Sequence, residues 1–307
     1  MDQLREVEEF LDRVRSFFKG RGYAEVITPY LLPYPNLDDN VYPIVCEASV
    51  PGLGRRRLFL HTSPEYPMKK LLARFGRSIF QICHAFRDRE GGRLHDLEFL
   101  MLEYYKVGED YRYLMEELSL LLKELFGPFV RYGGREVPAE PLMLRLEEAF
   151  KRYLGFVPDL SSEKALKKGL EAAGIHFEPE EDLETLFWRA YVELEKHLGF
   201  EGPTFVYDFP EPFGALARCR GGVCERFELY LFGLELANGY TEVNDPFEVR
   251  RRLERVSRKL NLPLDEEFVR IHEKLPPLYA GVSVGLDRLL LLKLGLKSIH
   301  ELYYRRL

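Results

Sequence analysis

The loop around Gly91 and Gly92 gathers charged side chains of both signs within a few residues. They are Arg87, Asp88, Arg89, Glu90, Arg93, His95 and Asp96. For such a loop taken alone, a solvated charged turn is the simpler interpretation. The strand that we expect after it favours a functional interpretation, because side chains of a strand alternate between two faces.

One face of that strand carries Phe99, Met101, Glu103, Tyr105 and Val107. A carboxylate and a phenol therefore share a face with large apolar side chains. A charge in such surroundings usually needs a partner or a ligand. Glu103 and Tyr105 are thus candidate ligand-binding residues.

Two more carboxylates, Glu235 and Glu242, lie seven residues apart in the run FELYLFGLELANGYTEVNDP. A continuous strand would point them to opposite faces, whereas a break at Asn238 and Gly239 would let both reach one site. Two carboxylates in a cleft with arginines suit Mg²⁺, which completes its shell with phosphate oxygens and water. Two surface glutamates near a turn are the alternative.

Arg288 lies in the first turn of an apolar helix that follows the small-residue run AGVSVG. A cation at a helix start opposes the helix dipole. Either Asp287 or a bound anion should therefore compensate it. Phosphate at the helix start is the functional interpretation, and a surface pair of arginine and aspartate is the alternative.

Regular elements must bring these residues together. Apolar alternation predicts strands over 23–30, 57–62, 78–87, 98–107, 204–209, 225–236 and 281–285. Helical periodicity predicts helices over 4–20, 65–75, 110–126, 181–198, 246–260 and 287–294.

Strands 78–87 and 98–107 are separated by the ten residues DREGGRLHDL, too few for a helical crossover. They should form an antiparallel hairpin. We therefore expect an α+β fold, with an antiparallel sheet flanked by helices rather than a doubly wound sheet. Residues 127–200 should form a helical insert without sheet strands.

The length of 307 residues and the 46% of hydrophobic residues fit a single domain over 1–307 that includes this insert. The formal charge of −6 argues against nucleic acid as the default partner.

Charges interrupt the first twenty residues, which excludes a signal peptide or a membrane span there and favours the cytoplasm. The few cysteines disfavour a disulfide framework, and Cys219 and Cys224 should be two free thiols beside a glycine turn.

Together, these segments resemble the three signature motifs of class II aminoacyl-tRNA synthetases. Residues 22–29 (GYAEVITP) resemble motif 1, residues 86–99 resemble motif 2, and residues 285–288 (GLDR) resemble motif 3. The segments HTSPE at 61–65, MLEYY at 101–105 and ELANGYTE at 235–242 are similar to the lysyl branch of that class. The resemblance implies the class II catalytic fold.

Further phrases, TSPEYPMKKLL, PTFVYDFP and GLELANGY, most resemble the elongation factor P lysine ligases. These are truncated paralogues of lysyl-tRNA synthetases that attach (R)-β-lysine to a lysine of that translation factor. The resemblance implies ATP and Mg²⁺ as cofactors, lysine or β-lysine as substrate and elongation factor P as protein partner. It also implies a homodimer through Pro29, with neither membrane nor tRNA as a partner. Because the sequence begins at the helix before motif 1, we expect no N-terminal anticodon-binding domain.

By this resemblance, Arg87 would hold the α-phosphate of ATP and the substrate carboxylate, and Arg288 the far phosphates. Other nucleotide-binding positions would be Asp88, Arg89, Asp96, Glu235, Leu236 and Gly285. Glu235 and Glu242 would carry Mg²⁺. The amino-acid pocket would consist of Ser63, Pro64, Glu65, Glu103, Tyr105, Asn238, Tyr240 and Glu242.

The chain departs from the lysyl pattern at several positions. Motif 2 usually reads arginine, any residue, glutamate, whereas here the acid is displaced to Glu90. Ser283 stands where lysyl-tRNA synthetases have glycine and the ligases have alanine, so the preferred lysine isomer stays open. Two alternative functions also stay open: a compact synthetase that charges tRNA, and a non-catalytic regulatory paralogue.

Overall fold

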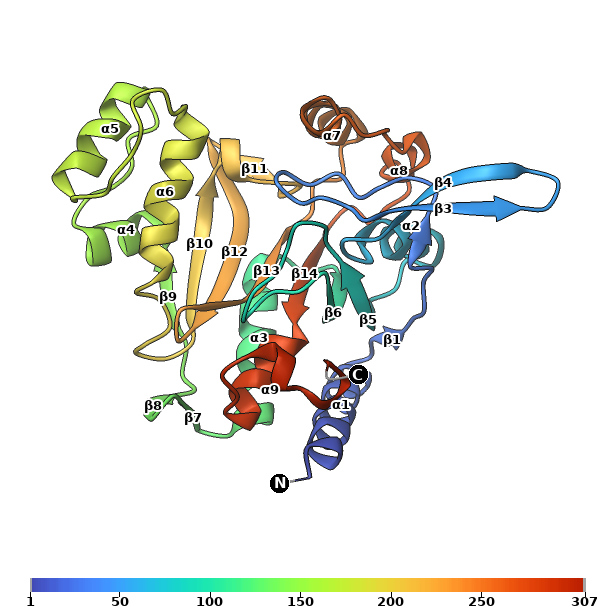
Figure 1. Ribbon diagram of the computed structural model, residues 1–307, viewed down its shortest axis with the longest axis horizontal. Coiled ribbons are helices and arrows are strands. Elements are labelled where there is room, and N and C mark those ends of the chain that lie inside the picture. Colours follow the sequence, from blue (N-terminus) through green and yellow to red (C-terminus); the bar gives the residue numbers. More distant parts are fainter. Residues whose placement is uncertain (1, 306–307) are drawn as a thin grey trace.

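The computed structural model describes residues 2–305 and is built around one nine-stranded sheet (Figure 1). Across the sheet, the strands are β1 (Ala24–Glu25), β5 (Ile79–Phe86), β6 (Glu98–Val107), β14 (Tyr279–Gly285), β13 (Leu234–Thr241), β12 (Val223–Leu231), β10 (Thr204–Pro210) and β9 (Leu142–Arg145). The ninth strand, β11 (Cys219–Arg220), pairs with β12. All pairs are antiparallel except β1 with β5 and β9 with β10. The predicted hairpin and the predominantly antiparallel sheet are therefore confirmed.

Three helices cover one face of this sheet: α1 (Gln3–Gly20), α3 (Tyr111–Phe126) and α9 (Leu286–Leu294). Their apolar stripes pack into a single core with the inward side chains of β5, β6, β13 and β14. Phe18 of α1, for example, stacks on Phe80 of β5 with ring centroids 5.1 Å apart. The side chain of Asp110 caps α3 by accepting from the backbone N–H groups of Arg112 and Tyr113.

Two groups of helices border the opposite face. α2 (Glu65–Phe75), α7 (Pro246–Leu260) and α8 (Glu266–Ile271) form one group, in which Tyr66 stacks on Phe268 at 3.5 Å. α4 (Leu146–Leu154), α5 (Glu163–Ala172) and α6 (Leu183–Glu195) form the other, with a core of its own. The two groups lie on either side of β13 and β14 in Figure 1.

The sequence analysis expected a purely helical segment over 127–200. This expectation is wrong, because the segment also contains strands. β9 joins the main sheet beside β10, and β7 (Phe129–Tyr132) forms a hairpin with β8 (Arg135–Pro138). These strands escaped detection because each spans only four residues, too few for alternation to stand out.

Other predictions need smaller corrections. The strand expected over 225–236 is two strands, since a turn at Phe232 and Gly233, both with positive φ, separates β12 from β13. The strand expected over 23–30 is regular only at β1. A separate three-stranded sheet contains β2 (Leu31–Leu32), β3 (Val45–Val50) and β4 (Gly54–Leu60). Short 3₁₀ helices are η1 (Glu211–Phe213), η2 (Ile299–Glu301) and η3 (Tyr303–Arg305).

The expectation of two free thiols at Cys219 and Cys224 is wrong, because they form a disulfide. The reason is local: β11 and β12 form a tight hairpin around Gly221 and Gly222, and the two cysteines are directly opposed across it. Of the helices in the described part of the chain, none is long and apolar enough to cross a membrane.

Candidate active site

A cavity of about 500 Å³ lies on the sheet face between the two groups of helices. Most of the predicted site residues line it, namely Ser63, Glu65, Arg87, Asp96, Glu103, Tyr105, Glu235, Leu236, Asn238, Tyr240, Glu242, Gly285 and Arg288. Pro64, Asp88 and Arg89 are not among the lining residues. The motifs, far apart in sequence, thus contribute to one cavity.

The floor of the cavity consists of residues that face each other across neighbouring strands. One row runs from Glu103 on β6 through Ser283 on β14 to Asn238 on β13 and Glu228 on β12. The next row is Tyr105, Gly281, Tyr240 and Arg226. Gly281 is required there, because a Cβ would lie 2.3 Å from the Tyr105 ring and 2.7 Å from a Glu242 oxygen.

Glu235 and Glu242 both reach the cavity, but the irregularity that allows it is not at Asn238 and Gly239. The register of β13 against β12 shifts between Ala237 and Glu235, opposite Leu229 and Tyr230. This β-bulge moves Glu235 to the face that carries Asn238 and Tyr240. The predicted convergence is confirmed, and the predicted position of the break is wrong.

Glu103 is a buried carboxylate that only hydroxyl groups contact directly. The Tyr105 hydroxyl donates to one of its oxygens at 2.6 Å and the Ser283 hydroxyl to the other at 2.5 Å. Among residues 2–305, no cation lies within ion-pair distance of it. Burial, together with the charge of Glu65, raises the pKa of Glu103 to about 7. A cationic ligand would therefore be strongly favoured here.

Glu65 and Glu242 share an internal cation. The Lys69 ammonium donates to Glu65 Oε1 and to Glu242 Oε2, each at 2.6 Å, and the lysine side chain is completely buried. The Tyr240 hydroxyl also donates to Glu65, at 3.4 Å. Sequence analysis did not single out Lys69, although its position four residues after Glu65 on one helix was a usable signal.

Glu235 differs from Glu242, because its carboxylate has no hydrogen-bond or ion-pair partner among the described residues. Burial and the charge of Glu228 raise the pKa of Glu235 to about 7, and Arg288 opposes the shift. A divalent cation at Glu235 would relieve this repulsion. Residues 2–305 contain no cluster of three or more His, Cys, Asp or Glu side chains that could hold a metal. Mg²⁺ does not require such a cluster, since phosphate and water supply most of its ligands.

Arg288 has no acidic partner within ion-pair distance in the part of the chain that the structure describes. Its guanidinium donates to the backbone carbonyl of Glu235 at 2.5 Å and lies 2.6 Å from His95 Nε2. Asp287 is engaged elsewhere, by Arg305 and Tyr304, both at 2.5 Å. The structure therefore contradicts compensation of Arg288 by Asp287, and a bound anion stays a prediction.

Arg87 reaches the cavity from the start of the motif 2 loop. Its guanidinium lies over the Phe99 ring at 4.9 Å and 3.5 Å from Glu90. Glu90, the displaced acid, thus lines the cavity, whereas Asp88 pairs with Tyr42 and Arg89 lies over the Tyr42 ring.

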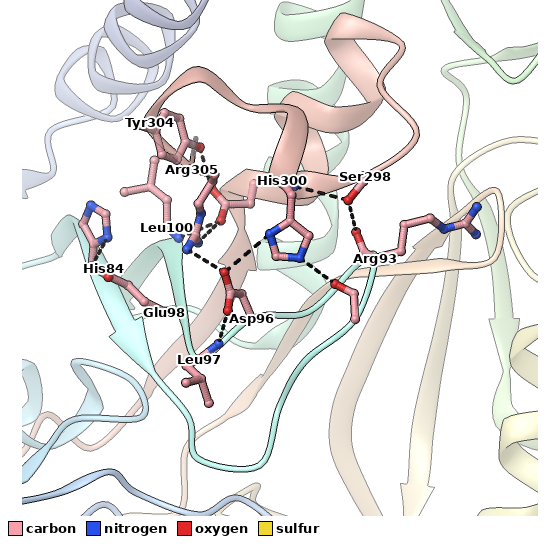
Figure 2. A network of polar contacts seen from close by, with 12 residues as sticks. His84, Arg93, Asp96, Leu97, Glu98, Leu100, Ser298, His300, Tyr304 and Arg305 are labelled. Atoms are coloured by element: carbon pink, nitrogen blue, oxygen red, sulfur yellow. Dashed lines mark hydrogen bonds and ion pairs between the residues drawn. The ribbon is translucent and has the colours of Figure 1, made fainter. Parts of the chain in front are cut away.

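The far side of the same loop is tied to the C-terminal segment (Figure 2). The Ser298 hydroxyl donates to the Arg93 carbonyl at 3.0 Å, and His300 Nε2 lies 2.9 Å from the Gly92 carbonyl. Asp96 lies 3.4 Å from the Arg305 guanidinium and 3.7 Å from His300. Asp96 therefore fixes the loop to the C-terminal segment as well as lining the cavity.

Several lining residues carry no motif and were missed. Asp38, Trp188, Phe213, Arg226 and Glu228 come from loops, the insert and β12. Arg226 donates to Glu228 at 2.5 Å and to Asn238 at 3.3 Å, and so orders the floor. Of these five residues, only Glu228 could have been predicted from the sequence, because it is an acid in the same apolar run as Glu235.

Residues 2–304 match the family described as tRNA synthetases class II (D, K and N). An elongation factor P–(R)-β-lysine ligase homolog of Aquifex aeolicus (strain VF5) is 51% identical over 306 residues, which cover 99% of this chain and all of that protein. The elongation factor P–(R)-β-lysine ligase of Vibrio atlanticus (strain LGP32) is 36% identical over 97% of this chain and 94% of its own. The protein of the same name from Haemophilus ducreyi (strain 35000HP / ATCC 700724) is 37% identical over 95% of this chain and 90% of its own.

Proposed function

The chain belongs to the class II tRNA synthetase family of the D, K and N type, and from that membership we propose that it activates lysine or (R)-β-lysine with ATP and transfers it to a lysine of elongation factor P. One observation carries the proposal. The same cavity holds Glu103, a buried anion without a cationic partner, and Arg288, a cation without an acidic one, among the described residues. A lysine ammonium and a nucleotide phosphate supply the two missing charges.

In the first step, a carboxylate oxygen of the amino acid attacks the α-phosphorus of ATP. The bond from that phosphorus to the bridging oxygen breaks, and pyrophosphate leaves with the electron pair. This displacement needs positioning and charge stabilisation more than a general base. Arg87 orients the α-phosphate and the attacking carboxylate, and Arg288 takes charge on the departing phosphates.

The amino acid is held at the other end of the cavity. Glu103 and Glu65 receive its ammonium groups, and Asn238 with Tyr240 and Ser63 shapes the wall. In the second step, the acceptor lysine amine attacks the adenylate carbonyl, AMP leaves and the amine loses a proton. The product is an amide on elongation factor P.

The chemistry that a bound Mg²⁺ would supply is neutralisation of phosphate charge. Glu235 is the residue that suits Mg²⁺ best, with Glu228 as the neighbouring acid. Glu242 forms an ion pair with Lys69 in the structure. We therefore assign Glu242 to the amino-acid pocket, and it would reach the metal only if its side chain reoriented.

We also propose a homodimer formed around Pro29. Its neighbour Ile27 is 92% exposed and Leu31 is 42% exposed, a pair of apolar side chains that a second copy would cover. Multi-angle light scattering of the purified protein tests this.

A translation factor as acceptor would place the enzyme in the cytoplasm.

The deciding experiment is ATP–pyrophosphate exchange with α-lysine, (R)-β-lysine or no amino acid, followed by transfer to purified elongation factor P. Lysine-stimulated exchange with a mass increase on that factor is the expected result. Exchange with transfer to bulk tRNA instead would support a compact synthetase. No exchange with any amino acid would overturn the enzymatic proposal and leave the regulatory paralogue.

A further inference from the structure

Lys69 is a completely buried charged side chain behind the amino-acid end of the cavity, where it contacts two of the lining acids. It has no exposed surface, and its ammonium lies between Glu65 of its own helix and Glu242 beyond β13. The rings of Tyr105 and Tyr240 lie 5.9 Å from the same nitrogen. A lysine ammonium already bound to two carboxylates thus lies directly behind the wall of a pocket that we propose to bind another lysine.

The position of Lys69 determines which carboxylate oxygens remain for a ligand. It engages one oxygen of Glu65 and one of Glu242. Glu103, next to them, is contacted directly by hydroxyl groups only. With Lys69 charged, the three acids and the one internal cation leave two negative charges, which equal the two ammonium groups of a diamino acid.

We propose that Lys69 is a positioning and specificity-determining residue, whose ammonium holds Glu65 and Glu242 in place as carboxylates and sets the pocket charge for a substrate with two ammonium groups. The inference rests on the proposed lysine activation and names the fixed counter-ion of that site. Lys69 acts through the two glutamates and does not itself touch the reacting atoms.

A purely structural ion pair predicts a different result. Losing one partner of a structural pair lowers the amount of folded enzyme, and it leaves the affinity of the remaining enzyme for lysine unchanged. Losing Lys69 as a counter-ion leaves the buried Glu242 and the partly exposed Glu65 without their shared cation, so Glu242 takes up a proton more readily. Other titratable or charged groups that face this cluster are Asp38, Glu103, Tyr105, Tyr240, His272 and Tyr279.

The first test is Lys69→Met, with Lys70→Met as its matched control. Lys70 is the next residue of α2 and also bridges two acids, Asp265 at 3.0 Å and Glu267 at 2.7 Å. Neither of these acids lines the cavity, whereas both acids that Lys69 bridges do. In lysine-dependent ATP–pyrophosphate exchange, we expect Lys69→Met to raise the KM for lysine about 100-fold, as for truncating one partner of a buried charge pair. The KM for ATP should stay within about threefold of the wild type, since nucleotide contacts are unchanged.

The pH dependence adds a readout that misfolding cannot imitate. Glutamates must be ionised to bind ammonium, and removing Lys69 raises the pKa of Glu242, because the Lys69 charge and hydrogen bond lower that pKa. The pH above which the KM for lysine becomes constant should therefore move upward in Lys69→Met and stay in place in Lys70→Met. A lower kcat with the wild-type KM and the wild-type pH profile would overturn the proposal.

Chemical rescue of Lys69→Ala provides a second, independent variant. Added propylammonium should lower the KM for lysine, because it restores an ammonium between the two glutamates, whereas propanol of similar size should not. Equal effects of the two additives, or none in a folded variant, would refute a counter-ion role. If the wild type shows no exchange with any lysine, the proposed function itself fails, whereas wild-type exchange with unaltered variants defeats only the inference.

Discussion

Replacing Glu103 by glutamine removes a buried carboxylate of the cavity that no cation among the described residues contacts directly. The amide keeps the shape of the side chain. Its oxygen can accept from one of the two hydroxyls, Tyr105 or Ser283, and its NH2 group can donate to the oxygen of the other. The negative charge is lost, and one hydrogen bond reverses its direction. Because the site is fully buried, truncating the charge pair with a substrate ammonium should cost about 2–5 kcal/mol, or roughly 30-fold to several thousand-fold in KM for lysine.

The pH dependence follows from the pKa of Glu103, which burial raises to about 7. Below that pH the carboxyl group is protonated in the free enzyme and cannot pair with the ammonium. The part of the KM for lysine that depends on Glu103 should thus fall by about tenfold per pH unit as the pH rises toward 7, and then level off. Burial raises the pKa of Glu242 to about 8, which adds a separate component above pH 7. In Glu103→Gln the component that depends on Glu103 should vanish.

The assay is ATP–pyrophosphate exchange over a range of lysine concentrations between pH 5.5 and 8.5. Glu98→Gln is the matched control, because Glu98 begins the same strand, is 48% exposed and pairs with His84 outside the cavity. A KM for lysine that does not change in Glu103→Gln, or a component of the pH profile near pH 7 that persists in this variant, would refute the role assigned to this carboxylate.

Ser283→Ala removes the hydroxyl that donates to Glu103, and the loss of about 1 kcal/mol should raise the KM for lysine about fivefold in the same assay; an unchanged KM would contradict this. Arg288→Ala should reduce kcat for exchange about 100-fold while the thermal-shift response to lysine alone persists, and loss of that response would contradict an assignment to phosphate. Gly239→Ala should destabilise the fold by at least about 1–3 kcal/mol in urea unfolding, because its Cβ would lie 2.7 Å from Val282 Cβ. A stability equal to that of the wild type would show that β13 and β14 can separate locally.

The sequence predicted which residues line the cavity better than it predicted which residues they contact. Spacing and strand alternation located Glu103 and Tyr105, and the motif order joined Arg87 to Arg288. No local signal reported the bulge opposite Leu229 and Tyr230, because a register shift depends on the strand paired with it. The position of β9 at the sheet edge is likewise a tertiary result, since four residues carry little pattern of their own.

The same limit explains why Glu235 and Glu242 looked equivalent in sequence. Both are acids of one apolar run, and both reach the cavity. Lys69 of α2 forms an ion pair with Glu242 and none with Glu235. In the function that we propose, this cation decides which acid is free for a metal and which belongs to the amino-acid pocket. Lys69 and Glu242 lie 173 residues apart in the sequence. The spacing of residues in the sequence therefore predicts which acids reach a site. The role of each acid depends on the charged residues that folding places next to it.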